Sequence, residues 1–408
     1  MTAGRRRSAH LHLAVAIGCA ALIGALLPHS PAVPSDAPVD AAGATPAAAP
    51  PPVGAATLGI RPPLSAVLVE ARTGQVLVAG DADVRRPVAS AIKLVTALAV
   101  VDVLAPGTAV EVGEEVRGIE GSSFELRPGD VRSVEDLLAG LLLRSGNDAA
   151  VALAVAVDGS EETFVERMAD VLASIGIDAR PRSSSGLEVG DALSASELAT
   201  VSRAALADPR LRPLLAAPTL VLADGTVAEN RNLFLLDTPD ATGLKTGFTS
   251  QAGFTLAASA MRDGRELVAV VLGAEDDLAR RELAGRLLEH GFARTVVLDA
   301  SPSVTLRTTG GDVLLRTMLG AVTVPHDATV TADWRTDLRP DGAPSHVELR
   351  VDGTAIGRVA VVRDAPSSPG GGSEGGVGAQ GDLGRSLADG VYAALRPRAL
   401  STARTGER

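Results

Sequence analysis

Thiols are almost absent from this 408-residue chain, which contains one cysteine, Cys19, inside an apolar N-terminal stretch. Once that stretch is removed no thiol remains, which excludes disulfides, cysteine nucleophiles and cysteine-based zinc sites. Histidine is also scarce, since residues 58–294 contain only His290. A Ser-His-Asp triad therefore cannot be assembled there, and a catalytic zinc would need mostly carboxylate ligands, which is unusual. We expect no metal and no cofactor.

Lysine is the third scarce residue type. Of the 38 basic side chains only Lys93 and Lys245 are lysines, and all the others are arginines. Arginine does not lose its proton in proteins, whereas a buried lysine can be neutral near pH 7. These two positions are therefore the candidates for amine chemistry.

Positive charge is not in excess either, because the net charge is −11. A nucleic-acid partner is therefore not expected. The length and the 46% hydrophobic content allow one large folded domain and a smaller one.

The first 57 residues have the composition of an export segment and a linker. Residues 1–29 combine a basic start with about 15 mostly apolar residues, which is typical of a secretory signal peptide and is also compatible with an uncleaved membrane anchor. The sequence before Cys19 is only faintly similar to a lipoprotein processing site. Residues 30–57 are rich in proline and alanine, as in a linker. In each case the working domain would lie outside the cytoplasm, and an uncleaved N-terminal segment would also associate it with the membrane.

Ser90 and Lys93 are the first candidate site. They stand three residues apart at the start of an apolar helix expected over residues 91–104, so the lysine can reach the serine hydroxyl. A serine becomes a nucleophile when a neighbouring base takes its proton, and a neutral lysine can be that base. The plain alternative is that Ser-x-x-Lys occurs here by accident on a buried helix.

Two further patches follow along the chain. Ser145, Gly146 and Asn147 separate two apolar helices, where they could simply be turn residues, and Asp148 is expected to cap the second helix. Lys245, followed by Thr246 and Gly247, lies on an expected strand, where glycine would permit close approach of a ligand backbone.

The expected elements define an α+β domain. A hairpin is expected over residues 65–79, helices over 161–176 and 194–207, strands over 243–249, 253–260 and 266–272, and a last helix over 277–290 that ends at Gly291. Strands at both ends with helices between them favour α+β over a repeating βαβ array.

Together the three patches resemble the motif set of penicillin-binding proteins and class A β-lactamases. Over about residues 58–294 the chain resembles the low-molecular-weight D-alanyl-D-alanine carboxypeptidases, peptidase family S11. The resemblance extends to the runs at residues 141–150, 243–249 and 270–273. It implies a serine β-lactamase/DD-peptidase-like fold, with an antiparallel sheet and a helical subdomain.

The resemblance also assigns roles. Ser90 would form an acyl-enzyme, Lys93 would activate it, and Ser145 and Asn147 would complete the proton relay and hold the substrate amide. The backbone N–H groups of Ser90 and Phe248 would form the oxyanion hole. The remaining substrate-binding positions, on the carboxylate side or supporting it, would be Lys245, Thr246, Gly247, Arg280 and Arg231.

Some positions depart from the family pattern, among them Ile92 in place of threonine and Thr242 in place of aspartate. A deacylating Glu-x-x-Leu-Asn element of the class A β-lactamase kind is not convincing in this sequence, so efficient penicillin hydrolysis is not expected.

The C-terminal third is less distinctive. Short β-prone runs between turn residues predict a small β domain over residues 295–364. Residues 365–408 begin as a glycine-rich linker and end in a tail, which is either disordered or a weakly amphipathic membrane-surface helix.

We therefore expect a serine-type carboxypeptidase that removes the terminal D-alanine of peptidoglycan stem peptides and is acylated by β-lactams. The alternatives are a β-lactamase, an esterase or a DD-endopeptidase of the same fold, and a non-catalytic wall-binding scaffold.

Overall fold

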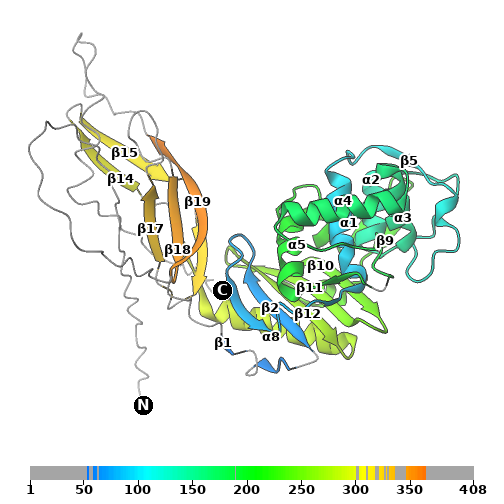
Figure 1. The fold of residues 1–408 in the computed structure, drawn as a ribbon, viewed down its shortest axis with the longest axis horizontal. Coiled ribbons are helices and arrows are strands. Elements are labelled where there is room, and N and C mark those ends of the chain that lie inside the picture. Colours follow the sequence, from blue (N-terminus) through cyan, green and yellow to red (C-terminus); the bar gives the residue numbers. More distant parts are fainter. Residues whose placement is uncertain are drawn as a thin grey trace, which may run out of the picture. The chain divides into compact units, whose positions relative to one another are not determined.

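The structure is a computed structural model in which the chain forms two compact units, one over Pro52–Thr295 and one that contains Val296–Arg408 with Met1–Pro51. It describes residues 53–54, 58–61, 64–188, 190–299, 303–308, 311–317, 321–325, 328, 330–335 and 346–363. The expected signal or anchor at 1–29 and the tail at 365–408 lie outside the described residues. Each unit is considered by itself (Figure 1).

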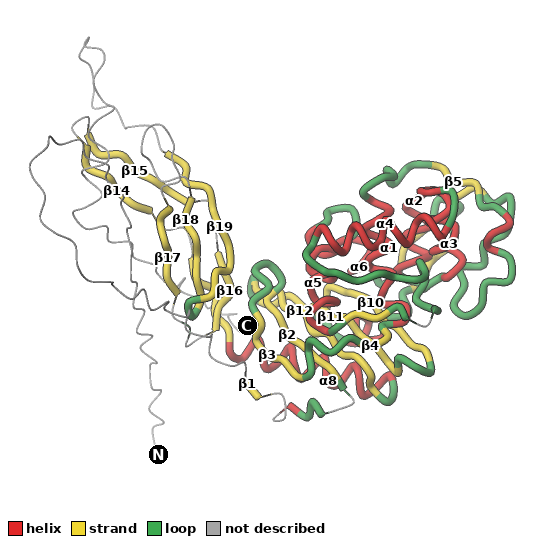
Figure 2. The backbone as a smooth tube through the Cα atoms, in the orientation of Figure 1, coloured by secondary structure: helices red, strands yellow, loops and turns green. Residues whose placement is uncertain are grey.

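The larger unit is built on a six-stranded sheet with the order β1-β3-β2-β12-β11-β10 (Figure 2). All neighbours are antiparallel except β1 and β3, which pair in parallel. The strands are β1 (Val53–Gly54), β2 (Ser65–Glu70), β3 (Val76–Gly80), β10 (Ala241–Thr249), β11 (Gly253–Arg262) and β12 (Arg265–Ala274). The hairpin and the three later strands are confirmed, whereas the expected linker contains the short strand β1.

Both faces of this sheet are covered, which is why its central strands carry runs of consecutive apolar residues, such as residues 66–69 of β2 and 267–272 of β12. In β2, Ala66 and Leu68 face the core around α8 (Asp277–Arg294), while Val67 and Val69 face the core of the helical part. Side chains that alternate between two apolar cores in this way fix the register of the strand.

The helical part inserts between β3 and β10. Its helices are α1 (Lys93–Val101), α2 (Val134–Leu142), α3 (Asn147–Asp158), α4 (Glu161–Ser174), α5 (Ala195–Ala207), α6 (Arg212–Ala216) and α7 (Leu233–Asp237), with 3-10 turns η2 (Ala89–Ile92) and η3 (Glu114–Val116). Three two-stranded ribbons join them: β4 (Arg86–Pro87) with β7 (Ala192–Leu193), β5 (Ala109–Glu111) with β6 (Val131–Ser133), and β8 (Thr219–Val221) with β9 (Val227–Glu229). Every residue of α1 is buried, so this helix is enclosed on all sides as its composition indicates.

The predicted end of the last helix is wrong. Helix α8 continues through Gly291 to Arg294, so this glycine is a buried interior residue and not a C-terminal cap. A side-chain carbon at this position would lie 2.6 Å from a methyl of Leu267 and 2.7 Å from one of Leu68. Glycine therefore permits the close approach of helix and sheet.

The second unit is all β in its described residues. It contains a five-stranded sheet of order β14-β15-β19-β18-β17 and a two-stranded pair of β13 with β16. The strands are β13 (Thr295–Asp299), β14 (Ser303–Thr308), β15 (Gly311–Thr317), β16 (Ala321–Pro325), β17 (Val330–Arg335), β18 (His346–Val351) and β19 (Thr354–Arg363). These strands lie in the stretch for which the sequence predicts a small β domain.

Two glycines of α8 provide a matched test of the close packing of this helix on the sheet. Gly291→Ala should lower the free energy of unfolding by about 1–2 kcal/mol, because overpacking against two buried leucines outweighs the gain in helix propensity. Gly285→Ala, where a methyl meets nothing within 4 Å, should raise it by about 0.5–1 kcal/mol. Denaturant unfolding measures both, and an equal effect of the two substitutions would contradict the packing.

Candidate active site

Lys93 lies at the centre of the site, at the junction of η2 and α1. Its ammonium nitrogen is within hydrogen-bond distance of three oxygens: 2.9 Å from Ser90 Oγ, 2.6 Å from Asn147 Oδ1 and 2.8 Å from the carbonyl oxygen of Ser185. The lysine is completely buried, whereas Ser90 is half-buried and open to a ligand. The predicted i, i+3 contact between serine and lysine is thus present.

These contacts suit either protonation state of the amine. A charged ammonium would donate to all three oxygens, whereas a neutral amine would donate to the two carbonyl oxygens and accept a hydrogen bond from the Ser90 hydroxyl. Electrostatics therefore decides which state is present. Burial, and secondly the charge of Lys245, lower the pKa of Lys93 well below its ordinary value, against the opposing effect of Asp148 and Asp191.

The turn between α2 and α3 contributes the next two predicted residues. Ser145 has a positive φ of 60°, an uncommon conformation for a residue with a side chain, and it turns the chain so that Asn147 begins α3. Asn147 donates through Nδ2 to the carbonyl of Glu120 (2.7 Å), while its Oδ1 faces Lys93. The Oδ1 atom can accept one further hydrogen bond from a ligand, and Nδ2 can donate one.

Asp148 does more than cap α3. Its buried carboxylate accepts hydrogen bonds from the backbone N–H of Phe124 (2.8 Å) and Leu126 (3.1 Å) and from the Ser123 hydroxyl (2.7 Å). It thereby holds residues 123–126, next to the Glu120 carbonyl that anchors Asn147. The expected helix cap is therefore also a support for the site.

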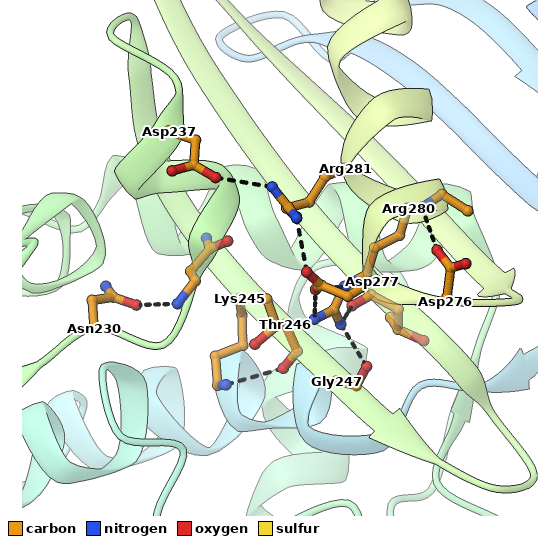
Figure 3. Close-up of polar contacts among 12 residues, drawn as sticks. Asn230, Asp237, Lys245, Thr246, Gly247, Asp276, Asp277, Arg280 and Arg281 are labelled. Carbon is orange, nitrogen blue, oxygen red and sulfur yellow. Dashed lines mark hydrogen bonds and ion pairs between the residues drawn. The ribbon is translucent and has the colours of Figure 1, made fainter.

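Strand β10 brings in the second lysine. Lys245 is buried, and its Nζ lies 3.0 Å from Ser145 Oγ and 3.0 Å from the carbonyl of Thr246, the latter contact being drawn in Figure 3. Burial, and secondly the charges of Arg280 and Arg231, lower the pKa of Lys245 to about 7. Both lysines of the chain thus converge on one site.

Glycine is required at position 247 by a contact within the protein, and not only by the approach of a ligand backbone that the sequence suggested. A side-chain carbon here would lie 2.7 Å from the carbonyl oxygen of Val88 and 3.1 Å from the backbone nitrogen of Ser90. The close approach is thus between β10 and the protein's own η2 turn, and it brings the backbone of Ser90 next to that of Gly247. The side chain of Phe248 is 55% exposed and packs on Phe254, with ring centroids 4.4 Å apart.

Arg280 does not point freely into the site. Its guanidinium donates to the carbonyls of Gly247 (2.9 Å) and Thr255 (2.8 Å) and pairs with Asp277 (2.5 Å), as Figure 3 shows for Gly247 and Asp277. Arg280 therefore holds β10 in position through the carbonyl of Gly247. Its charge also lowers the pKa of Lys245. Arg281 pairs with the same aspartate and with Asp237.

Arg231 is a cation of the site whose donors are free among the described residues. It is exposed, and its guanidinium has no hydrogen-bond or ion-pair partner among the residues that the structure describes. Its backbone N–H donates to the carbonyl of Leu143 (3.0 Å), which places it beside Arg144, whose charge lowers the pKa of Arg231 after the larger effect of burial. Positive charge thus gathers on the Lys245 side of the site.

Metal ligands do not gather in the part of the chain that the structure describes: no group of three or more histidine, cysteine, aspartate or glutamate side chains could hold an ion there.

Comparison with known proteins identifies the family of this chain. The sequence profile of the D-alanyl-D-alanine carboxypeptidase family, S11, matches residues 61–276, more than half of the chain. The chain belongs to this family.

Among its relatives are the D-alanyl-D-alanine carboxypeptidases DacD of Salmonella typhimurium (38% identical over 256 residues, 58% of this chain) and of Escherichia coli (39% over 240 residues, 55% of this chain). The matched parts cover 65% and 62% of those two proteins, so the chain matches less than two thirds of either relative.

Solved structures of the S11 family's fold resemble the chain over a longer stretch. Penicillin-binding protein 6B of Escherichia coli has a TM-score of 0.59 and 31% identity, covering 73% of this chain and 94% of its own. Penicillin-binding protein 5 of Haemophilus influenzae has a TM-score of 0.62 and 27% identity, covering 73% and 95%. The expected α+β DD-peptidase-like fold is confirmed.

Reasoning from sequence missed the backbone carbonyl that one loop contributes to this S11 site. The loop at residues 182–191 supplies the Ser185 carbonyl to Lys93, and Asp191 holds that loop by accepting from the N–H of Arg182 (2.6 Å) and the hydroxyl of Ser183 (2.6 Å). Three consecutive serines at 183–185 were the available signal, but nothing in their spacing connects them to Ser90.

Proposed function

We propose that this protein is a serine-type D-alanyl-D-alanine carboxypeptidase that releases the terminal D-alanine of peptidoglycan stem peptides through an acyl-enzyme on Ser90. The observation that carries the proposal is the contact between the half-buried Ser90 hydroxyl and the fully buried amine of Lys93. A base of lowered pKa beside an accessible hydroxyl is the arrangement that nucleophilic catalysis needs. The names of the family and of its relatives supply the substrate class.

In the acylation step, Ser90 Oγ forms a bond to the carbonyl carbon of the penultimate D-alanine while its proton moves to the neutral amine of Lys93. The N–H groups of Ser90 and Phe248 stabilise the developing oxyanion, since β10 runs directly beside the Ser90 turn. The carbon–nitrogen bond then breaks, and the proton that Lys93 took from Ser90 passes through the Ser145 hydroxyl, which lies 3.0 Å from Lys245, to the leaving amine of the terminal D-alanine. Lys93 is thereby neutral again before deacylation begins.

In deacylation, Lys93 takes a proton from water, whose oxygen attacks the ester carbonyl. The proton returns to Ser90 Oγ as the ester bond breaks, which restores the free enzyme and releases the shortened peptide. The same base thus serves both steps.

The substrate's terminal carboxylate lies on the cationic side of the site. Lys245 and Thr246 hold it, with Arg231 as a further donor and with Arg280 holding the strand beneath. An uncharged amide in place of that carboxylate would lose these charge-assisted hydrogen bonds.

The setting we propose for this reaction is the outer face of the cytoplasmic membrane or the cell wall. The basic and apolar composition of residues 1–29 supports export, either as a cleaved signal or as an anchor. Helices within the described residues are all too short or too polar to cross a membrane.

A penicillin adduct tests the nucleophile. After incubation with penicillin, mass spectrometry of the wild type should show one covalent adduct on Ser90, and Ser90→Ala should show none. The same variant should lose D-alanine release from a pentapeptide. An adduct that persists in Ser90→Ala would refute the assignment, and an adduct without D-alanine release would favour a different activity of the same fold.

The pH profile tests the two lysines. The value of kcat/KM should rise as Lys93 loses its proton and fall above pH about 7, where Lys245 loses the charge that binds the carboxylate. Lys245→Arg keeps a positive charge beside Lys93 at every pH, so the rising part should remain while the fall disappears. An unchanged fall in this variant would contradict the role of Lys245.

A further inference from the structure

Ser184 has all its polar groups occupied by partners from two helices. It is fully buried and directly precedes Ser185, whose carbonyl accepts a hydrogen bond from Lys93. The backbone N–H of Ser184 (2.8 Å) and its hydroxyl (2.5 Å) both donate to Oε1 of Glu161. Its carbonyl accepts from the hydroxyl of Thr96 (2.6 Å). These contacts fix the residue next to the carbonyl that touches the base.

The two partners of Ser184 come from different parts of the helical region. Thr96 lies on α1, one turn after Lys93, so it belongs to the same buried helix as the base. Glu161 is the first residue of α4 and is only half-buried. None of the three sequence patches that define the site includes a residue of α4. Glu161 therefore connects a helix outside the site to the base within it.

The Ser185 carbonyl determines where the lone pair of Lys93 points. A neutral amine has two N–H donors and one lone pair. The donors are used by the Ser185 carbonyl (2.8 Å) and by Asn147 Oδ1 (2.6 Å), which leaves the lone pair for the Ser90 hydroxyl (2.9 Å). Once the Ser185 carbonyl moves away, a donor can turn toward Ser90 Oγ, and the amine no longer accepts the proton.

The other contacts of the loop do not replace Glu161. Asp191 holds residues 182–183, and Thr96 holds only the carbonyl of Ser184. Loss of the Glu161 carboxylate would therefore leave the N–H and the hydroxyl of Ser184 buried without these partners. An unsatisfied buried donor costs more than an ordinary hydrogen bond contributes, so the segment would shift until water reached these groups.

From these contacts we infer that Glu161 is a positioning residue for the reaction. Through Ser184 it holds the Ser185 carbonyl where that carbonyl orients the amine of Lys93. The inference rests on the proposed function and adds to it a residue that does not touch the substrate.

The rate and the extent of acylation by penicillin test this role. Glu161→Ala should lower the second-order rate constant of adduct formation about ten- to a hundredfold, the loss expected when a catalytic group is displaced by up to about 1 Å. At saturating penicillin all molecules of the variant should still become acylated. A purely structural role would instead lower the acylated fraction or the Tm and leave the rate constant of the folded molecules unchanged.

Two further variants separate geometry from charge. Glu161→Gln should keep the rate constant within about twofold of the wild type, because both contacts are made to one oxygen, which the amide carbonyl can replace. Glu161→Asp, whose side chain is shorter by one methylene, should behave like Glu161→Ala.

Glu162→Ala is the matched control. Glu162 is also an acidic residue in the first turn of α4, but it is exposed and has no hydrogen-bond or ion-pair partner in the part of the chain that the structure describes. Its substitution removes the same charge from the same helix end and should leave the rate constant unchanged.

An unchanged rate constant in Glu161→Ala, or an equal loss in Glu161→Gln, overturns the inference. D-alanine release from a pentapeptide is measured in parallel. A wild type that is acylated but releases no D-alanine overturns the carboxypeptidase, whereas the acylation rates of the variants still decide the role of Glu161. A wild type that penicillin does not acylate overturns both.

Discussion

The enclosure of one amine, that of Lys93, is the constraint on which this structure depends. An ammonium ion removed from water is strongly destabilised unless polar groups compensate it, so the amine tends to become neutral. Here three oxygens supply enough hydrogen bonds to make burial tolerable, and the positive charge of Lys245 opposes protonation. The fold thus prepares a base before any substrate arrives.

Three segments far apart in sequence must meet to create that environment: the turn before α3, the 182–191 loop and strand β10. Two buried carboxylates support this arrangement. Asp191 organises the loop, and Asp148 holds residues 123–126, next to the Glu120 carbonyl that anchors Asn147. Their charges also raise the pKa of Lys93, against the larger effect of burial. Asp148 and Asp191 therefore hold backbone groups in position, while their charges are too weak to restore the ordinary pKa of Lys93.

The sequence predicted the parts of this site that depend on local spacing. Ser90 and Lys93 meet because they are three residues apart on a helical turn, and the strands around Lys245 follow from their apolar runs. It did not predict the Ser185 carbonyl or the partners of Arg280, since these contacts join distant segments and involve backbone groups that every residue has. Gly291 was misread for a related reason: a helix cap and a close packing contact both favour glycine, and only the neighbouring sheet distinguishes them.

Because the chain has only two lysines, the central claim can be measured directly. Lysine labelled with ¹³C at Cε should give two side-chain resonances, which Lys245→Arg assigns, and each can be followed by NMR as the pH is raised. The account predicts that the Lys93 resonance changes to that of a neutral amine well below the ordinary lysine pKa of about 10.4. A Lys93 resonance that keeps the ammonium shift up to that value would contradict it.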